Sequence, residues 1–494
     1  MNPLYRQSLG DRYERYFIHS GSRWPHSGVK LKGAIPHYLP FPFNLAYAAA
    51  YLRGTCFEPC VIDAVALNLS EDSLLQEISR IDPDAVFYEF TTPTVERDLV
   101  LADRIKRSTR ARVIIGGAHA AYFACEIIRK YKAIDFIIRG EYEYTLAQLM
   151  RALAENRSCQ IAGVVYLTNG SVVDNGCPRG QDFLKVPLRE IFPSNDQPDP
   201  TVYWDGFCQL RPALQLQSSR GCKYSCSFCL NSQAAGNPAK YQVLPAEEVC
   251  AAIINAKKMY GIREVYFDDD NFTQDMQHVD DIFGLMQGKK ASIKWSAMSG
   301  FSILTPEVIR RLVDYGCIGL KLGIESASRQ VLKGIHKPID LDHVAGMISC
   351  LRRYGIKTHL TFSIGFLDET LVDIKRTISH AQSLAADSIQ LSIATPFPGT
   401  EFFEQAKARN LLSAVPWENY DGKRTSVICS SSFNPQALGR IRRSGLRNWF
   451  IRRIFSPLWL IAHLRVILRS LNGLGCTVFF KQLFEVLIDE NKNR

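Results

Sequence analysis

The sequence lacks any long hydrophobic run, and this absence excludes several classes of protein. No stretch of about 18 consecutive apolar residues occurs among its 494 residues. Its first 17 residues contain no apolar core of signal-peptide length. Internal repeats and low-complexity tracts are also missing. We therefore expect a cytoplasmic chain with no membrane-spanning segment and no secretory leader.

The composition is that of a folded protein with several domains. Apolar residues make up 46% and charged residues 22%, which excludes wholesale disorder and collagen-like or coiled-coil architectures. At roughly 150 residues per domain, the chain has room for two to four packed domains. The formal net charge of +10 suits an anionic ligand, a membrane face or nucleic acid, and does not decide among them.

The 14 cysteines are the most informative residue type. In a cytoplasmic chain they remain thiols by default, so a tight group of them points first to metal or redox chemistry. Eleven are scattered, whereas Cys222, Cys226 and Cys229 lie within eight residues of one another.

Residues 15–153 alternate apolar runs of strand length with helical patterns, which predicts five βα units. The expected strands are Tyr16–His19, Cys60–Asp63, Ala85–Phe90, Arg112–Ile115 and Ile134–Ile138, and the expected helices are Asn44–Leu52, Asp72–Ile81, Val95–Ser108, Cys125–Tyr131 and Thr145–Ala154. Such units form an open parallel sheet that is covered on both faces and binds ligands beyond the carboxyl ends of its strands. We take residues 1–154 as this domain.

Residues 155–212 break the alternation and are interpreted as a linker with a small hairpin. Two apolar runs, Val164–Thr168 and Val172–Val173, flank Asn169-Gly170, a pair that favours a type I′ turn. Prolines follow at positions 187, 193, 198, 200 and 212.

The alternation resumes over residues 213–430. Six strands are expected: Leu214–Ser218, Glu264–Phe267, Ile293–Ala297, Gly319–Gly323, Thr358–Ile364 and Ser388–Ala394. Helical patterns lie between them, for example at Ala246–Tyr260, Pro306–Tyr315 and Leu341–Tyr354. Six parallel units predict a partial barrel, in which chemistry collects on the loops after the strands.

Residues 431–494 form a basic, aromatic region that we expect to be helical. Eight arginines and no acidic residue lie between Arg440 and Arg469, together with aromatic residues such as Trp449 and Phe450. Such a helix either packs its apolar side onto its own domain or lies on an anionic membrane surface. The sequence leaves both interpretations open.

The cysteine array follows the first expected barrel strand. Cys222, Cys226 and Cys229 have the spacing C-x3-C-x2-C on a strand-to-helix loop. Three thiolates so spaced can hold three irons of a [4Fe-4S] cluster and leave the fourth open to a chelating ligand. A structural zinc site would need a fourth ligand nearby, and the nearest candidates, Cys208 and Cys250, have no paired spacing with the array.

The array resembles the signature of the radical S-adenosylmethionine (SAM) superfamily, whose cysteine loop follows the first strand of a (β/α)6 partial barrel. Four later segments also resemble motifs of that family: Tyr266–Phe272, Gly323–Ala327, Ser363–Phe366 and Thr395–Thr400. The resemblance implies SAM contacts at Phe228, Asp268, Glu325, Ser326, Gly365 and Pro396, and cluster ligation by Cys222, Cys226 and Cys229. No catalytic residue is assigned.

Two of these assignments have plain alternatives. Glu325 has the chemistry to accept hydrogen bonds from two ribose hydroxyls, and its alternative is a solvated carboxylate at a strand end. Asp268, Asp269 and Asp270 would repel one another if all were buried, so we expect at most one or two to face the site. The others would then cap a helix or lie in a solvated turn.

The amino-terminal sheet resembles the cobalamin-binding domain of the B12-dependent radical SAM group. The matching segments are Pro40–Tyr47, Val61–Asp63, Ile114–His119 and Arg139–Glu141. The resemblance implies cobalamin contacts at Thr91, Gly116, Gly117, His119 and Glu141. The two adjacent glycines would let a bulky ligand touch the backbone, although a tight strand-to-helix turn explains them almost as well.

One feature of many cobalamin domains is missing. Modules that bind cobalt through histidine carry Asp-x-His-x-x-Gly after the first strand, whereas the corresponding loop here, Ser20–Gly28, has His26 without that spacing. We assign no cobalt ligand to His26. Some members of the radical SAM group likewise leave cobalt without a protein imidazole.

The resemblance implies an α/β enzyme with three parts: a Rossmann-like cobalamin domain with an open parallel sheet, a radical SAM (β/α)6 partial TIM barrel and a helical carboxyl-terminal region. The implied cofactors are a [4Fe-4S] cluster, SAM and cobalamin. The implied reaction begins with reductive cleavage of SAM to a 5′-deoxyadenosyl radical and ends in methylation of an unactivated carbon through methylcobalamin.

The expected partners are a small-molecule substrate and an electron donor such as flavodoxin or ferredoxin. The basic aromatic tail suggests a hydrophobic or lipid-like substrate and peripheral contact with the inner face of the membrane. No nucleic acid is expected.

Three other functions are weighed. A non-methylating radical reaction, such as the oxidative cyclisation by anaerobic magnesium-protoporphyrin ester cyclase, uses the same architecture. An RNA-modifying methylthiotransferase would need a cysteine-bearing amino-terminal cluster domain, for which Cys56 and Cys60 are only two loose candidates. A metal-stabilised scaffold without activity would leave the later strand-end motifs unexplained.

Overall fold

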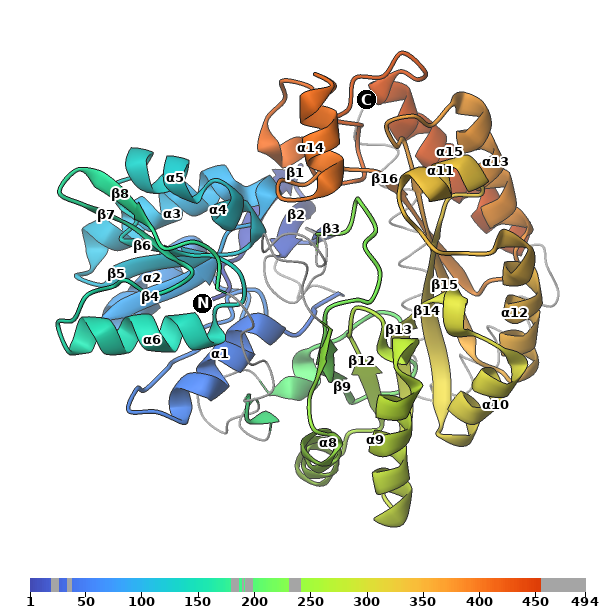
Figure 1. Ribbon diagram of the computed structural model, residues 1–494, viewed down its shortest axis with the longest axis horizontal. Helices are drawn as coiled ribbons and strands as arrows, with labels where there is room; N and C mark the ends of the chain where they lie inside the picture. Colours follow the sequence, from blue (N-terminus) through green and yellow to red (C-terminus); the bar gives the residue numbers. More distant parts are fainter. Residues whose placement is uncertain are drawn as a thin grey trace.

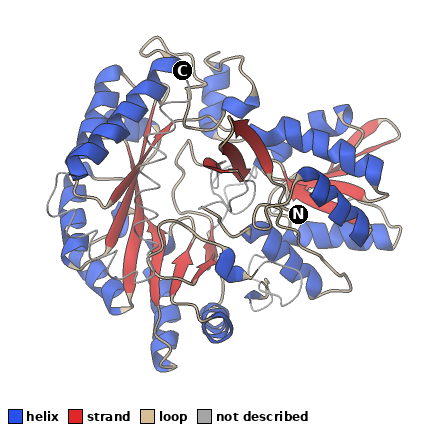
Figure 2. Ribbon diagram, turned by 180° about the vertical axis from the view of Figure 1, so that it is seen from behind, coloured by secondary structure: helices blue, strands red, loops and turns tan. Residues whose placement is uncertain are grey.

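The computed structural model describes residues 1–18, 26–32, 38–178, 186–188, 191, 199–230 and 241–454. Two α/β units lie side by side, and a small antiparallel sheet lies between them (Figure 1). Seen from behind, helices cover both faces of the amino-terminal sheet and the outer face of the larger, curved sheet (Figure 2).

The amino-terminal sheet has the strand order β4-β5-β6-β7-β8. Its parallel strands are β4 (Ala85–Glu89), β5 (Arg112–Gly116) and β6 (Phe136–Ile138), and its antiparallel strands are β7 (Val164–Thr168) and β8 (Ser171–Asp174). The last three of the five predicted parallel strands are therefore confirmed. The predicted hairpin also forms, but it extends this sheet from β6, whereas the sequence placed it in a linker.

The first two predicted strands do not join this sheet as expected. Tyr16–His19 falls in β2 (Tyr13–Ile18) of a separate antiparallel sheet with β1 (Tyr5–Leu9) and β3 (His26–Leu31). Cys60–Asp63 forms only a parallel bridge, between Asp63 and Asn2. Since the Met1 amino group also donates to the Phe87 carbonyl at 2.6 Å, the start of the chain lies between Asp63 and β4.

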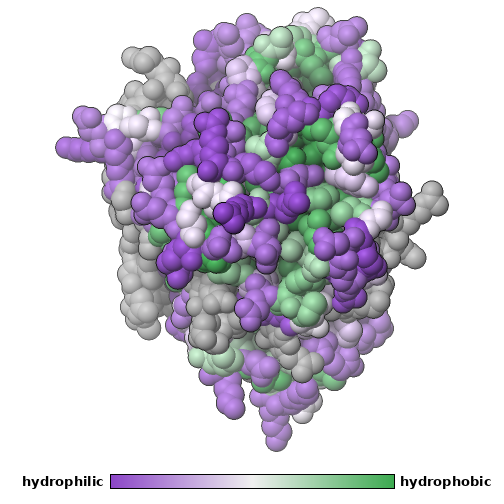
Figure 3. Space-filling model, turned by 90° about the vertical axis from the view of Figure 1, so that its left-hand side faces the viewer, coloured by the Kyte–Doolittle hydropathy of each residue, from purple (hydrophilic) through white to green (hydrophobic). Residues whose placement is uncertain are grey.

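Helices cover both faces of the amino-terminal sheet. The five predicted helices correspond to α1 (Phe43–Arg53), α2 (Glu71–Ile81), α3 (Val95–Ser108), α5 (Ala124–Lys130) and α6 (Glu143–Ala154), and α4 (Ala118–Tyr122) is added after β5. Side chains of α1 and α6 are buried with Ile114, whereas those of α3 and α5 are buried with Val113 and Ile115. The outer face of this unit is mostly hydrophilic with smaller apolar areas between (Figure 3).

The second unit is a parallel sheet of six strands in sequential order, ending at β9 and β16, as predicted. Its strands are β9 (Ala213–Leu216), β12 (Glu264–Phe267), β13 (Lys294–Ser299), β14 (Cys317–Glu325), β15 (Lys357–Ile364) and β16 (Ser388–Ile393). The helices of this unit are α8 (Ala246–Tyr260), α9 (Met276–Gly288), α10 (Pro306–Asp314), α11 (Arg329–Gly334), α12 (Leu341–Arg353), α13 (Leu371–Ser383) and α14 (Glu401–Ala408). A short ladder, β10 (Ser219–Arg220) with β11 (Gln242–Val243), follows β9.

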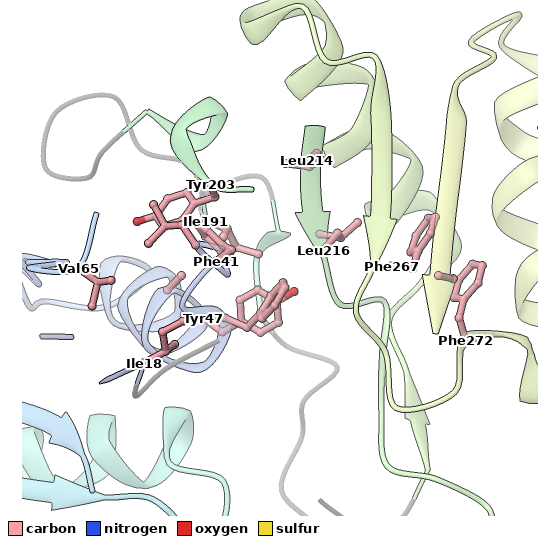
Figure 4. Close-up of a cluster of buried hydrophobic side chains, with 14 of the residues drawn as sticks. Ile18, Phe41, Tyr47, Val65, Ile191, Tyr203, Leu214, Leu216, Phe267 and Phe272 are labelled. Carbon is pink, nitrogen blue, oxygen red and sulfur yellow. The ribbon is translucent and has the colours of Figure 1, made fainter. Parts of the chain in front are cut away.

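One apolar core joins the two units. Phe41 and Tyr47 lie between the amino-terminal unit and the β9 residues Leu214 and Leu216 (Figure 4). The Phe41 amide also donates to Gln215 Oε1 at 3.1 Å. The sheets are therefore packed together by buried side chains as well as linked through the chain.

The carboxyl-terminal region begins with helix α15 (Pro435–Ile454), which packs on β16 and α13. Leu438 and Trp449 are buried, and Arg442 Nε donates to the Leu391 carbonyl at 2.8 Å. The apolar side of this helix thus covers its own domain, while Arg440 and Arg447 are exposed. Residues 455–494, including Arg465 and Arg469, lie outside the described residues. No helix in the described part of the chain is both long and apolar enough to cross a bilayer.

Candidate active site

The cysteine loop begins at the carboxyl end of β9. The acidic residues that follow β12 accept hydrogen bonds from its first residues. Asp269 accepts hydrogen bonds from the Ser218 amide at 3.0 Å and from Ser219 Oγ at 2.5 Å. Asp270 accepts from the Gly221 amide at 2.9 Å. Two members of the acidic run therefore organise the backbone just before Cys222, a role that the sequence did not predict.

A glutamine fixes the next part of the loop. Gln274 Oε1 accepts from the Lys223 amide at 2.8 Å, and Gln274 Nε2 donates to the Gly221 carbonyl at 3.1 Å. Gly221 itself has φ +83°, a conformation that favours glycine. The loop is thus preorganised on both sides of Cys222.

The second half of the loop packs against the turn after α11. The Ser227 amide donates to the Ile335 carbonyl at 3.1 Å, and Cys226 Sγ lies 3.6 Å from the His336 carbonyl oxygen. Burial raises the pKa of the Cys222 thiol, and it raises that of Cys226 to about 12. Iron must therefore displace thiol protons when it binds, as metal sites built from cysteine generally require.

A cation stands beside these thiols. Lys337 Nζ lies 3.2 Å from Glu325 Oε1. Burial alone would lower the pKa of Lys337, but Glu325, Cys226 and Cys229 raise it above its ordinary value. The ammonium therefore offsets the negative charge of the carboxylate and of any thiolate formed on the loop.

Glu325 is held in an unusual backbone conformation at the end of β14. Its φ is +69°, and the pairing of β14 with β15 shifts register between Gly323 and Glu325. Its side chain is buried and accepts from Ser363 Oγ at 3.4 Å as well as from Lys337. Backbone strain of this kind is concentrated at functional sites, and the solvated strand-end alternative for Glu325 is wrong.

The structure brings some of the other predicted SAM residues together and separates one. Phe228 packs edge-on against Phe366, the residue after Gly365, with ring centroids 5.6 Å apart. Ser326 is buried and its Oγ lies 3.2 Å from Thr377 Oγ1 of α13, on the outer side of the sheet. Ser326 is thus an outer-face residue, and a SAM contact through its hydroxyl has no support in this geometry.

The two remaining predicted SAM residues lie at strand ends. Asp268 directly follows β12, and its amide donates to the Leu216 carbonyl at 2.8 Å. Pro396 is buried in the turn after β16. Both lie at the carboxyl edge of the barrel, and their contacts with SAM stay predictions.

The predicted cobalamin residues follow β4, β5 and β6 and therefore lie along one edge of the amino-terminal sheet. Thr91 Oγ1 is 2.8 Å from Thr94 Oγ1. His119 is buried, its Nδ1 is 3.2 Å from Thr92 Oγ1, and its ring packs edge-on against Trp417 at 5.0 Å. Burial lowers the pKa of His119 to about 3, so its imidazole is neutral.

The paired glycines have a packing explanation. A Cβ on Gly117, which has φ +92°, would lie 2.5 Å from the Phe90 carbonyl oxygen. A Cβ on Gly116 would lie 2.9 Å from the Phe87 ring. Close approach to the backbone that follows β4 therefore requires Gly117 whether or not a ligand touches it, whereas at Gly116 the Phe87 side chain would have to move.

His26 does not follow the first parallel strand. It begins β3, where its backbone pairs with Ile18 of the antiparallel sheet. Residues 26–28, the described end of the segment compared with the cobalt-ligand loop, thus belong to the antiparallel sheet.

A contact between the two units lies next to the cysteines. Arg220 forms an ion pair with Glu143 at the start of α6, and its Nη1 lies 3.7 Å from Glu141 Oε1. Asn44 Oδ1 accepts from Arg220 Nη2 at 3.3 Å. The sequence predicted Glu141 as a cobalamin contact. It gave no sign that Arg220, which lies 77 residues beyond Glu143, would pair with Glu143 and approach Glu141.

The donor set of the cysteine loop fits an iron–sulfur cluster. It offers three sulfurs from one loop beside a cationic side chain. In the described part of the chain, no three His, Cys, Asp or Glu side chains come close enough together to chelate a single metal ion. A tetrahedral zinc site with Zn–S bonds of about 2.3 Å needs such a tight group. Three cysteines so closely spaced along the chain are the donors that ligate iron–sulfur clusters.

The edge of the amino-terminal sheet fits a ligand rich in amides. Glu141, Glu143 and Glu89 are three carboxylates at the interface around Arg220, and Glu89 accepts from Asn44 at 3.3 Å. Burial raises the pKa of Glu141, with a smaller contribution from the nearby Glu143 carboxylate. The primary amides of a corrin ring can donate hydrogen bonds to such carboxylates.

Comparisons with known proteins agree with this geometry. Residues 34–150 match the B12 binding domain, and residues 216–381 match the radical SAM superfamily. An uncharacterized methyltransferase of Pyrococcus horikoshii is 29% identical over 417 residues, which cover 83% of this chain and 88% of that protein. The anaerobic magnesium-protoporphyrin IX monomethyl ester cyclase of Rubrivivax gelatinosus is 23% identical over 456 residues, covering 89% and 78%.

Solved structures show the same fold. The cobalamin-dependent SAM radical enzyme OxsB, with aqua-cobalamin and SAM bound, aligns with a TM-score of 0.64 at 16% identity, covering 90% of this chain and 74% of that chain. The radical SAM methyltransferase TsrM of Kitasatospora setae, with tryptophan substrate and a SAM analogue bound, aligns with a TM-score of 0.63 at 18% identity, covering 76% and 74%. At these identities the likeness concerns the fold.

Proposed function

We propose that this chain, which matches the radical SAM superfamily over residues 216–381 and the B12 binding domain over residues 34–150, is a cobalamin-dependent methyltransferase acting on an unactivated carbon. One observation carries the proposal: through Arg220, the cysteine loop contacts the sheet edge predicted to hold cobalamin. A methyl carrier and a radical generator must work on one substrate, so their sites must be adjacent.

The residues of the site have distinct roles in this proposal. When bound, the [4Fe-4S] cluster supplies the electron that cleaves SAM to methionine and a 5′-deoxyadenosyl radical, and cobalamin carries the methyl group to the substrate. Cys222, Cys226 and Cys229 hold the cluster. Glu325 accepts hydrogen bonds from the ribose hydroxyls, while Lys337 forms an ion pair with the same carboxylate.

The amino-terminal residues orient the second cofactor. We propose that Thr91, Gly116, Gly117, His119 and Glu141 contact the corrin or its tail. Neutral His119, covered by Trp417, contributes packing and one ring nitrogen without adding charge. These groups bind and exclude water without moving a proton.

Polar side chains on two barrel strands support a proposal about the polar part of the substrate. His359 and Thr361 on β15, and Gln390 and Ser392 on β16, alternate with buried apolar residues and are at least partly exposed. We propose that a small, lipid-like substrate places its hydrogen-bonding end against this wall. A flavodoxin or ferredoxin would supply electrons.

The carboxyl-terminal region motivates peripheral membrane contact. Arg440, Arg447 and Arg452 are exposed on α15. Replacing all three with Gln in the full chain should reduce co-sedimentation with vesicles that contain anionic lipid, because each basic group near such a surface contributes about 1 kcal/mol. The matched control replaces exposed Arg80, Arg107 and Arg157 of the amino-terminal unit. Equal recovery of the two triple variants would remove the basis for this contact.

A second function is favoured by one comparison. The cyclase of Rubrivivax gelatinosus matches more of this chain than the Pyrococcus methyltransferase does, 89% against 83%. A non-methylating radical reaction therefore remains the alternative. The B12-binding match over residues 34–150 argues against the RNA-modifying methylthiotransferase, which needs a cluster domain there.

Anaerobic reconstitution with iron, sulfide and hydroxocobalamin, followed by dithionite and SAM, tests the proposal. We expect both 5′-deoxyadenosine and S-adenosylhomocysteine, because the second product reports methyl transfer from SAM to cobalt. Deoxyadenosine alone would favour the cyclase-like alternative. Replacing Cys222, Cys226 and Cys229 with Ala should abolish deoxyadenosine formation and preserve the fold, whereas Cys429→Ala, at an exposed thiol, should change neither.

A further inference from the structure

Arg220 is a buried cation in the barrel unit, and its ion-pair partners lie in the amino-terminal unit. It lies two residues before Cys222, on strand β10. Its side chain is 12% exposed, and that of Glu143, its ion-pair partner, is 8% exposed. A pair this well covered is not the solvent-screened surface bridge that contributes little.

The charges around Arg220 depend on it. Burial would lower the pKa of Arg220, but Glu143 and Glu141 raise it, so the guanidinium stays charged. It also lies over the Tyr47 ring, 5.5 Å from its centroid. Without Arg220, Glu141 and Glu143 of the amino-terminal unit would lose their cation from the barrel, and the ion pair that joins the two units would be lost.

The partners of Arg220 lie at the sheet edge where the cobalamin residues are predicted. Glu141 follows β6 and Glu143 begins α6, so both belong to the edge where the cobalamin residues are predicted. On the other side of Arg220, Tyr47 Oη donates to the Gln217 carbonyl at 3.0 Å and holds the strand that leads into the loop. One side chain therefore spans from the cluster ligands to the cobalamin edge.

We infer that Arg220 is a positioning residue that fixes the spacing between the cysteine loop and the cobalamin edge of the amino-terminal sheet. This inference rests on the proposed function, because the spacing matters for methyl transfer only when a corrin is bound at that edge. Arg220 touches no reacting atom. It acts by holding Glu141 and Glu143 against the start of the cysteine loop, just before Cys222.

The two reactions of SAM should depend on this spacing to different extents. Radical formation requires SAM and the cluster, which both belong to the barrel. Methylation of cobalt requires SAM and the corrin, which belong to different units. Loss of the contacts of Arg220 with Glu141 and Glu143 should therefore slow S-adenosylhomocysteine formation far more than 5′-deoxyadenosine formation.

The first test needs no cofactor. Hydrogen–deuterium exchange of the full apo chain should show exchange faster by on the order of tenfold in residues 141–147 and 217–222 of Arg220→Gln, with β14 unchanged. Arg220→Lys keeps the charge and should lie between. The matched control is Arg112→Gln, at an arginine of the amino-terminal sheet that is paired with Asp135 and 58% exposed. Unchanged exchange in both segments of Arg220→Gln would overturn the inference.

The second test uses the reconstituted enzyme. We expect the ratio of S-adenosylhomocysteine to 5′-deoxyadenosine to fall about tenfold in Arg220→Gln, to recover partly in Arg220→Lys and to stay constant in Arg112→Gln. A parallel fall of both products would overturn the positioning role. If Arg220→Gln does not fold, Glu143→Gln breaks the same pair and is read in the same way. Absence of S-adenosylhomocysteine from the unmodified enzyme would instead refute the proposed function. The exchange experiment would still show whether Arg220 holds the two units together.

Discussion

Lys337 Nζ and Glu325 Oε1 lie 3.2 Å apart, with Cys226 close enough to raise the pKa of the same ammonium. The pair joins the end of β14 to the turn that packs on the cysteine loop. A carboxylate predicted to bind ribose is thus coupled electrostatically to the predicted cluster ligands.

Lys337→Met should destabilise the apo chain by about 1–3 kcal/mol, because it leaves the Glu325 carboxylate buried without its counter-ion. Urea unfolding measures this change. The double variant Lys337→Met with Glu325→Gln should regain most of the loss, since no unpaired charge then remains. Equal destabilisation of the single and double variants would show that the two side chains are not coupled.

Asp269→Asn should lower the iron content of the reconstituted protein, because the carboxylate accepts hydrogen bonds from both Ser218 and Ser219 before the cysteine loop. We expect a stability loss of about 1–3 kcal/mol. Asp281→Asn, on the exposed side of α9, is the control. Full iron occupancy in Asp269→Asn would contradict the role of Asp269 in shaping the loop.

Gly117→Ala should destabilise the fold by about 2–4 kcal/mol, because its Cβ would meet the Phe90 carbonyl at 2.5 Å in addition to the cost of a positive φ. Gly176→Ala shares the positive φ but has nothing within 4 Å, so it should cost about 1 kcal/mol. The difference between the two unfolding free energies isolates the clash. Equal values would show that packing on β4 does not require Gly117.

Glu369 should make stability depend on pH. Burial raises the pKa of its carboxyl from 4.5 to about 7. The folded chain then binds more protons than the unfolded chain between these values, so the free energy of unfolding falls as pH rises from 4.5 to 7, by at most about 3 kcal/mol. Glu369→Gln can still accept from the Gly365 and Phe366 amides and should flatten this part of the profile. An unchanged slope in urea unfolding between pH 4.5 and 7 would contradict the assignment.

Much of the fold was predictable because the barrel strands are short apolar runs separated by helical patterns. Cys222 could be placed at the carboxyl end of β9 for the same reason. The first parallel strand could not be found, since Met1 and Asn2 are too few residues to show a period. Tyr16–Ile18 was assigned to the wrong sheet because composition alone does not distinguish parallel from antiparallel pairing.

The candidate site was only partly predictable from local patterns. Glu325 has a positive φ where β14 and β15 shift register, so simple alternation cannot tell which way Ser326 faces. The Arg220–Glu143 pair joins residues 77 positions apart, and nothing in either local sequence identifies the other. Contacts of this kind arise from domain packing.

The central claim is that one iron of a cluster on Cys222, Cys226 and Cys229 has no protein ligand and binds SAM. The most direct measurement is electron paramagnetic resonance of the anaerobically reconstituted, dithionite-reduced protein with and without SAM. We predict a [4Fe-4S]+ signal that changes on SAM addition and is absent when the three cysteines are replaced by alanine. A protein that binds zinc in place of iron, or a cluster whose signal is indifferent to SAM, would contradict the account.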